Sequence, residues 1–148
     1  MIRDMNRSIF YEDCNCFALR QAARYITQIY ERHLGQVGLT AAQFTILARL
    51  ARTPDATVID LAEAMVMERT TLVRALKPLQ RDGLVVSELS RRDGRAYVFR
   101  LSKSGERAFD QAAVAWGNAQ DEFESKVGPE RARSLRAELF YMTADQTA

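Results

Sequence analysis

The stretch LAEAMVMERTTLVRALKPLQRDGLV, residues 61–85, holds most of two short helical patterns with a brief break between them. We expect the first helix at 57–65 and the second at 69–82, because each segment repeats apolar residues at spacings of three and four. The apolar positions are Val58, Leu61, Ala62 and Met65 in the first helix, and Leu72, Leu76 and Leu79 in the second. Two short helices joined by a turn at 66–68 have the spacing of a helix-turn-helix.

A basic β-hairpin is expected directly after the second helix. Residues 84–89 are rich in branched side chains, and residues 97–101 show the alternation of a partner strand. The pair Asp93-Gly94 between them is typical of a tight hairpin turn. Three arginines crowd around that turn: Arg91, Arg92 and Arg95. Three helices followed by such a hairpin make a winged helix.

Amphipathic helices flank this central unit. A first helix is expected from residue 14 to 34, and a further one begins after Thr40, which forms a capping-box pattern with Gln43. Ser102 caps a long helix that runs to about residue 126, and Pro129 suits the first turn of a last helix. The apolar stripe of the first helix consists of Cys16, Leu19, Ala23, Ile26 and Tyr30.

The stripes of the first helix and the last two helices present more apolar surface than these segments can bury alone. They predict that the two ends of the chain pair with each other and with a second copy. Gly117 lies inside the long helix, where glycine costs about 1 kcal/mol relative to alanine. This cost suggests that another element packs closely against the helix there.

Length and composition indicate one domain with a core of its own. The chain has 148 residues, of which 47% are hydrophobic and 27% are charged. It has no apolar run long enough to span a bilayer and no signal-peptide pattern, so we expect a cytoplasmic protein. The two cysteines, Cys14 and Cys16, are too few for a disulfide framework or a structural zinc site.

Charge is concentrated in the middle of the chain. Residues 66–105 contain nine Lys or Arg residues against four Asp or Glu residues, a net charge of +5, whereas the rest of the chain carries −3. A basic segment between mildly acidic ends favours an anionic partner for the middle. A solvated charged surface is the alternative.

These motifs together resemble the MarR family of bacterial transcriptional regulators. The resemblance rests on a Gly-Leu-Val-like step after the recognition helix, an Asp-x-Arg wing and a Leu-Thr-x-x-Gly start to the next helix. In this chain the three motifs are Gly83-Leu84-Val85, Asp93-Gly94-Arg95 and Leu101-Ser102-Lys103-Ser104-Gly105. Two departures are visible: Val66 stands at a turn position where glycine is frequent, and Pro78 should kink the recognition helix.

The resemblance implies a mainly α fold with a small β-hairpin wing. The whole chain, 1–148, would form a single domain with a winged helix-turn-helix at about 40–102. The dimerisation helices would lie at about 13–35 and 103–143. The partners implied are double-stranded DNA with a pseudo-palindromic operator and a second copy of the chain, with no cofactor, metal or membrane.

Arginines near the start of a recognition helix can donate two hydrogen bonds to guanine in the major groove. Arg69 and Arg74 are therefore expected to read bases, and Thr70 and Thr71 to contact phosphate or a thymine methyl group. At the wing, Arg95 is expected to enter a minor groove, with Asp93 orienting it. The full set expected to bind DNA is Thr57, Arg69, Thr70, Thr71, Arg74, Lys77, Arg91, Arg92 and Arg95. Arg91 and Arg92 are expected at phosphates.

Regulators of this family commonly bind small anionic or aromatic effectors between the dimerisation helices and the winged helix. The candidates here are Arg20 and Arg24 on the first helix, with Phe44 and Trp116 as walls. Alternatively, the two aromatic residues belong to the core and the two arginines to the surface.

A second mode of sensing follows from a resemblance to the branch of the family that senses organic hydroperoxides. Cys16-Phe17 and Tyr30 match that branch, whereas Arg20 and Ala41 stand where it has further tyrosines. Cys16 also falls on the apolar stripe, where cysteine is an ordinary small hydrophobic residue. We therefore expect Cys16 to be structural, with redox sensing as the alternative.

Other classes of function fit less well. His33 is the only histidine, and no nucleophile–base pair, paired acids or metal cluster stands out, so an enzyme is not expected. A winged helix that binds protein would need an apolar exposed face instead of a basic one. The sequence predicts a homodimeric regulator, most simply a repressor released by a small-molecule ligand.

Overall fold

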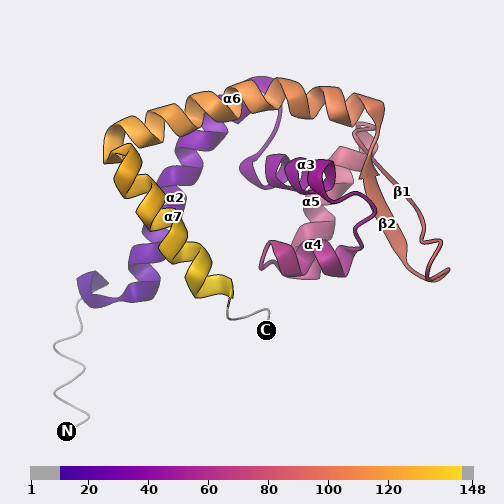
Figure 1. Cartoon of the computed structure of the whole chain (residues 1–148), viewed down its shortest axis with the longest axis horizontal. Coiled ribbons are helices and arrows are strands. Elements are labelled where there is room, and N and C mark those ends of the chain that lie inside the picture. The colour runs from indigo at the N-terminus through magenta and orange to yellow at the C-terminus, as the bar shows by residue number, and fades with distance from the viewer. Residues whose placement is uncertain (1–10, 145–148) are drawn as a thin grey trace, which may run out of the picture.

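The computed structural model describes residues 11–144. One long helix, α6 (Lys103–Val127), runs across the top of the molecule and joins two groups of elements (Figure 1). One group consists of α2 (Asn15–Leu34) and α7 (Pro129–Ala144). The other consists of α3 (Ala41–Arg52), α4 (Val58–Ala64), α5 (Arg69–Arg81), β1 (Val85–Leu89) and β2 (Tyr97–Leu101). Two single-turn 3-10 helices, Tyr11–Asp13 and Gly35–Val37, complete the order, and the predicted mainly α fold with a hairpin is confirmed.

The helices begin and end where the sequence carries capping residues. The hydroxyls of Thr40 and Thr57 each accept a hydrogen bond from the third amide of the helix that follows. In return, the side-chain oxygens of Gln43 and Asp60 accept a hydrogen bond from the amides of Thr40 and Thr57. The hydroxyl of Ser102 accepts from the Gly105 amide at 3.0 Å and so opens α6. These reciprocal bonds satisfy amides that have no partner inside the helix.

The core is centred in the second group, and Leu34 of α2 and Ala112 and Ala115 of α6 also belong to it. Leu47, Leu50, Leu61, Leu72 and Leu76 are each at most 1% exposed. Side chains of α3, α4 and α5 therefore meet around one centre, with Val85 and Phe99 of the hairpin covering one side. Burial of a leucine side chain stabilises a fold by about 1.5–3 kcal/mol, so these contacts hold the unit together.

The hairpin is anchored to this core at its base. Its strands pair antiparallel with Val85 opposite Leu101, and Phe99 also forms an isolated bridge to Ala56 in the α3–α4 loop. A Cβ atom at Gly105 would stand 2.0 Å from the Leu84 carbonyl oxygen, so only glycine allows α6 to start this close to β1. Close packing was expected at Gly117, but nothing lies within 4 Å of a Cβ atom there.

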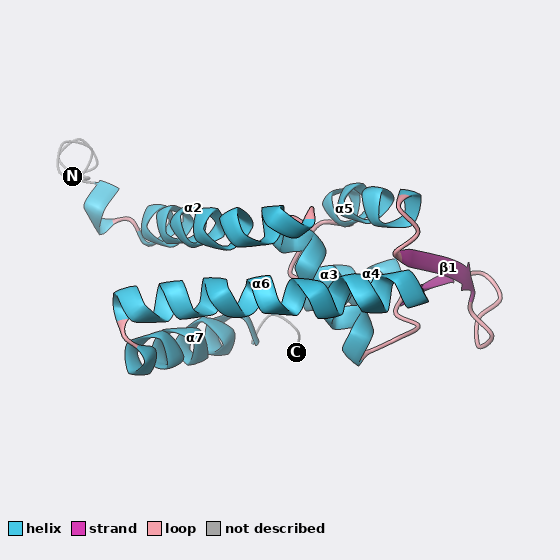
Figure 2. Ribbon diagram, turned by 90° about the horizontal axis from the view of Figure 1, so that it is seen from above, coloured by secondary structure: helices cyan, strands magenta, loops and turns pink. Residues whose placement is uncertain are grey.

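The helices α2 and α6 lie side by side (Figure 2). The Tyr30 hydroxyl donates to Gln120, and the Arg32 guanidinium binds both oxygens of Glu122 at 2.8 and 3.0 Å. Only the second half of the expected stripe packs within the chain, because Cys16, Leu19 and Ala23 are exposed. That a second copy covers the first half of the stripe stays a prediction. No helix among residues 11–144 is long and apolar enough to cross a membrane.

Candidate DNA interface

The turn between α4 and α5 sets the direction in which α5 projects. Val66 has φ 48°, a left-handed conformation that is rare for a β-branched residue. The turn is held by the Met67 amide, which donates to the Ala62 carbonyl at 2.9 Å, and by the Val66 amide, which donates to Glu63 at 3.2 Å. The departure seen at Val66 thus leaves the helix-turn-helix geometry intact, with local strain in place of the usual glycine.

Helix α5 is amphipathic. Leu72, Leu76 and Leu79 are buried against α3 and α4, and the opposite face is polar and exposed. That exposed face carries Arg69, Thr70, Thr71, Arg74 and Lys77. A helix anchored on one side by leucines is a rigid support for these side chains, and five of the residues predicted to bind DNA lie together on it.

Pro78 does not end the helix. It removes one backbone hydrogen bond, the one that its amide would have donated to Arg74, yet α5 continues to Arg81. Gly83 follows the end of α5 and has φ 73°, the left-handed conformation that is expected after a helix.

Most cations of α5 and the wing have no acidic partner among the described residues. Within residues 11–144, Arg81 pairs with Asp82, and Arg100 pairs with Asp55 and Glu88. No ion pair is formed in that range by Arg69, Arg74, Lys77, Arg91, Arg92 or Arg95, all of which are exposed. Arg69 and Arg74 therefore have no ion-pair partner in the described part of the chain, and the nearby Glu68 and Asp82 do not bind them.

The tip of the hairpin is a wing loop of seven residues, 90–96, in which the Ala96 amide donates to the Asp93 carbonyl at 3.1 Å and closes a turn around Gly94. Gly94 is not among the glycines with positive φ, which a tight primed turn would require. The Ser90 hydroxyl accepts from the amides of Arg92 and Asp93 at 3.2 and 3.3 Å, and the Ser90 amide donates to Ala96. These bonds shape the loop and leave its arginine side chains in solvent.

Asp93 orients Arg95 through the backbone. Its carboxylate accepts a hydrogen bond from the Arg95 amide at 3.3 Å, and among the described residues its oxygens have no contact with the guanidinium. The hydrogen bond thus fixes the Arg95 backbone and leaves the Arg95 side chain exposed to solvent. Thr57, the remaining residue predicted to bind DNA, is half-buried and caps α4.

The expected effector region contains a hollow of about 450 Å³ between α2, α3 and α6. Phe44 stacks on Trp116 with ring centroids 6.3 Å apart and on Phe109 at 5.6 Å. The lining residues are Tyr30, Leu34, Ala41, Phe44, Thr45, Ala48, Phe109, Ala113 and Trp116, none of which is charged. Arg20 and Arg24 are exposed on α2 and do not line this hollow, so the structure brings together only the aromatic half of the predicted set.

The two residues of the redox alternative are far apart within the chain. Cys16 and Tyr30 lie fourteen positions apart on the same helix, which corresponds to about 21 Å. Burial raises the pKa of Tyr30, with Glu124 adding to the effect and Arg136 opposing it, and its hydroxyl donates to Gln120. Cys16 is exposed within the single chain, so no residue among 11–144 buries its thiol, and its structural or redox role stays a prediction.

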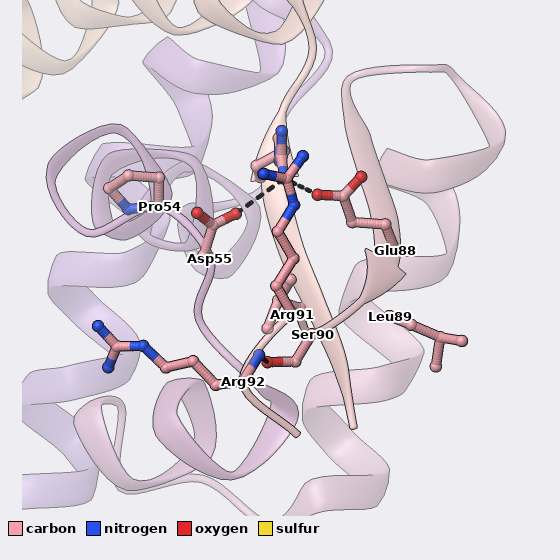
Figure 3. Close-up of a pocket in the computed structure, with 9 residues that line it drawn as sticks. Pro54, Asp55, Glu88, Leu89, Ser90, Arg91 and Arg92 are labelled. Carbon is pink, nitrogen blue, oxygen red and sulfur yellow. Dashed lines mark hydrogen bonds and ion pairs between the residues drawn. The ribbon is translucent and has the colours of Figure 1, made fainter. Parts of the chain in front are cut away.

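Sequence reasoning missed two charged clusters. Glu122 accepts from Arg32 and lies 3.1 Å from His33 Nε2, and these hydrogen bonds lower the pKa of Glu122 to about 2. At the base of the wing, Arg100 lies between Asp55 and Glu88 (Figure 3). Once the strand register is known, Glu88 and Arg100 are diagonal neighbours of opposite charge on the two strands, and this arrangement predicts their ion pair. Asp55 gives no such signal.

Helix-turn-helix, hairpin wing and unpaired cations together define a DNA-binding protein of the winged-helix class. Comparison with known proteins agrees: a model of the MarR family matches residues 37–96. The DNA complex of the M. tuberculosis transcriptional regulator MosR is 35% identical, with 92% of this chain and 100% of that chain covered and a TM-score of 0.76.

Two further relatives are similar over most of their length. The organic hydroperoxide resistance transcriptional regulator of Bacillus subtilis (strain 168) is 26% identical over 129 residues, 84% of each chain. The homoprotocatechuate degradative operon repressor of Escherichia coli is 29% identical over 118 residues, 80% of this chain and 77% of that relative. The chain belongs to the MarR family of DNA-binding transcriptional regulators, and its relatives are not enzymes.

Proposed function

We propose that this protein is a homodimeric transcriptional repressor that leaves its operator when a small molecule binds. The observation that carries the proposal is the set of exposed cations on α5 and the wing loop that have no acidic partner among the described residues. Uncompensated cations on two neighbouring projections fit an extended polyanion, because each phosphate contact releases counterions and adds affinity. Both projections lie on the side of the molecule away from α7 (Figure 1).

Each projection has its own role in this proposal. Helix α5 enters the major groove, where Arg69 and Arg74 contact base edges and Thr70, Thr71 and Lys77 contact nearby groups or phosphates. The wing loop reaches the adjacent minor groove through Arg95, and Arg91 and Arg92 contact phosphates. The Thr57 hydroxyl lies at the start of α4, at the phosphate side of a helix-turn-helix.

The second copy is proposed to cover the apolar surface of the outer helices, within about 13–35 and 103–143. On α7, Phe140, Tyr141 and Met142 are 68%, 74% and 49% exposed. A two-fold dimer would present two α5 helices to half-sites about 34 Å apart, one turn of DNA, and therefore to a pseudo-palindrome.

Selection of bound fragments from a random duplex library tests the proposal. We expect the wild type to enrich a pseudo-palindrome with that half-site spacing. Arg74→Ala should reduce affinity for the enriched site more than for random DNA, because base contacts specify and phosphate contacts position. Lys77→Ala is the matched control and should weaken both by similar factors. An equal loss for both DNAs with Arg74→Ala would make Arg74 a phosphate contact.

The hollow beside Phe44 and Trp116 supports an uncharged aromatic effector over an anionic one, since no cation lines it. An aromatic ring would pack against the stacked rings of Phe44 and Trp116. The Tyr30 and Thr45 hydroxyls would form its hydrogen bonds. Trp116 is the only tryptophan, so its fluorescence reports directly on occupancy. Neutral phenols and their carboxylated analogues should be titrated side by side, with DNA release as the second readout. Tighter binding of the carboxylates would contradict this choice.

A redox response through Cys16 is the second candidate. It is favoured by the exposure of the thiol and by the similarity to the B. subtilis hydroperoxide resistance regulator. Cys14 is also exposed, and its sulfur accepts the Phe17 amide at 3.4 Å. Cumene hydroperoxide should be added to the DNA complexes of the wild type, Cys16→Ser and Cys14→Ser. Release of the wild type but not of Cys16→Ser, reversed by a thiol reductant, would establish peroxide sensing in place of ligand sensing.

A further inference from the structure

The guanidinium of Arg100 connects three segments at the base of the wing. Its Nη2 atom lies 3.2 Å from Asp55 Oδ1 in the α3–α4 loop, and the same nitrogen donates to Glu88 on β1. Figure 3 shows both interactions converging on one side chain, beside a hollow of about 550 Å³ that Arg91 and Arg92 also line. Arg100 therefore links both strands of the wing to the loop that leads into α4.

Asp55 is held in an unusual conformation to make this contact. Its φ is 62°, in the left-handed region that non-glycine residues rarely adopt. The Asp55 amide donates to the Phe99 carbonyl at 3.1 Å, and the Phe99 amide donates to Ala56 at 2.8 Å. Two backbone bonds thus bring the Asp55 carboxylate to the edge of β2, where Arg100 is the next residue after Phe99.

The arrangement contributes little to stability. The side chains of Arg100, Asp55 and Glu88 are 42%, 56% and 49% exposed, and ion pairs at such sites contribute little because water screens them. The Nε atom of Arg100 is buried without a hydrogen-bond partner, which costs free energy. Orientation is therefore a better explanation of the cluster than folding energy.

The ion pairs of Arg100 join the wing to the body of the molecule, and the angle of the wing matters for DNA binding. The wing loop projects from two short strands, and its arginines are useful only if the hairpin stands at the correct angle to α5. Arg100 pairs with Val86 near the base of the hairpin, whereas Glu88 pairs with Val98 farther out, so the ion pair ties the base of β2 to the outer part of β1. The Ala56–Phe99 bridge holds β2 against the α3–α4 loop, and β1 has no such backbone bridge to that loop among the described residues, so its tie to the loop runs through Arg100.

We propose that Arg100, held by Asp55 and Glu88, is a positioning residue that sets the angle of the wing for DNA binding. The inference rests on the proposed DNA-binding function, and it assigns Arg100 a role that differs from those of the wing-loop arginines. Arg100 acts through its ion pairs with the carboxylates of Asp55 and Glu88. It changes affinity by placing Arg95 of the wing loop where it can contact DNA.

The sharpest test removes the carboxylates and keeps every cation. Asp55→Asn/Glu88→Gln takes two negative charges away from the DNA-facing side, so simple electrostatics predicts tighter binding. Positioning predicts the opposite, a loss of about tenfold in affinity for the enriched operator, comparable to losing one charged contact. Asparagine tolerates a positive φ at position 55, so the backbone there is retained. Asp121→Asn/Glu138→Gln, which removes the same charge from exposed positions of α6 and α7, is the matched control.

A double-mutant cycle gives an independent readout. Arg100→Met keeps the side-chain stem and removes the guanidinium, and it should weaken binding in the wild type but cause little further loss in an Arg95→Ala background. Hydroxyl-radical protection of the minor groove should fade in Arg100→Met, while the base preference set by α5 stays unchanged. Unchanged or tighter binding by Asp55→Asn/Glu88→Gln, or additive losses in the cycle, would overturn the proposal. If the wild type enriches no operator, the proposed function itself fails.

Discussion

The winged-helix unit and the outer helices differ in how completely one chain buries their apolar faces. In the unit, Leu61, Leu72 and Leu76 are at most 1% exposed, and the exposed side chains of α5 and the wing loop include the unpaired cations. On the outer helices, Leu19, Tyr25 and Phe140 are 43%, 49% and 68% exposed. The first region is complete as a single chain, whereas the second requires a further surface to pack against.

This difference separates two tasks within one fold. The unit that we propose to contact DNA has a closed core, so its exposed side chains can change without altering its packing. The outer helices are the part that we propose to associate with a second copy, and α6 runs through both regions (Figure 1). A change at the outer helices should therefore alter operator binding through the dimer, and a change at the unit should alter it directly.

The largest expected effect comes from charging the exposed face of α7. Phe140→Asp/Tyr141→Asp should give a monomer in light scattering at micromolar concentration. Operator affinity should fall by about 10²–10⁴-fold, because two linked half-site contacts become one. Val37→Asp, at another exposed apolar position outside the outer helices, is the control and should remain dimeric. A wild-type monomer, or a doubly charged variant that stays dimeric, would contradict the comparison.

A smaller effect is expected where the two regions join. Gly105→Ala places a methyl group against the Leu84 carbonyl and should lower the free energy of unfolding by about 1–3 kcal/mol. The matched control is Gly117→Ala in the same helix, where the space is open. That change should stabilise the protein by up to about 1 kcal/mol, because alanine is the better helix former. Denaturant unfolding of both variants checks the opposite signs, and equal shifts would refute the close approach at Gly105.

The smallest effect concerns the charged link between α2 and α6. The hydrogen bonds from Arg32 and His33 lower the pKa of Glu122 from its ordinary 4.5 to about 2 in the folded chain. Because the folded value is the lower one, the stabilisation is present above about pH 4.5 and is lost as the pH falls toward 2. Glu122→Gln should therefore flatten the acid-induced loss of stability within that window. Glu138→Gln, an exposed carboxylate on α7, should leave the slope as in the wild type.

Much of the fold follows from local signals that are strong in this sequence. The helix starts at Thr40, Thr57 and Ser102 were predictable because a hydroxyl side chain satisfies the first free amides of the helix that follows. The left-handed ending at Gly83 was predictable for a similar reason, since glycine adopts that conformation without steric cost.

The rest depends on contacts between distant segments, which periodicity does not encode. Gly105 is required by the Leu84 carbonyl, twenty-one positions earlier, and nothing at Gly105 itself announces that contact. Asp55 meets Arg100 only because the Ala56–Phe99 bridge brings the loop to the strand. The exposure of Cys16 in the single chain was not predictable, because a helical stripe does not say which part of its length is covered within one chain.

The central claim is that α5 and the wing loop both contact DNA. The salt dependence of operator binding tests this claim most directly. Affinities of the wild type, Arg95→Ala and the control Arg133→Ala should be measured over a series of salt concentrations. Arg95→Ala should bind more weakly, with a slope of log K against log salt lower by about one unit and an unchanged thermal midpoint. Arg133→Ala, on α7, should match the wild type. Equal affinity and slope for Arg95→Ala and the wild type would show that the wing does not touch DNA.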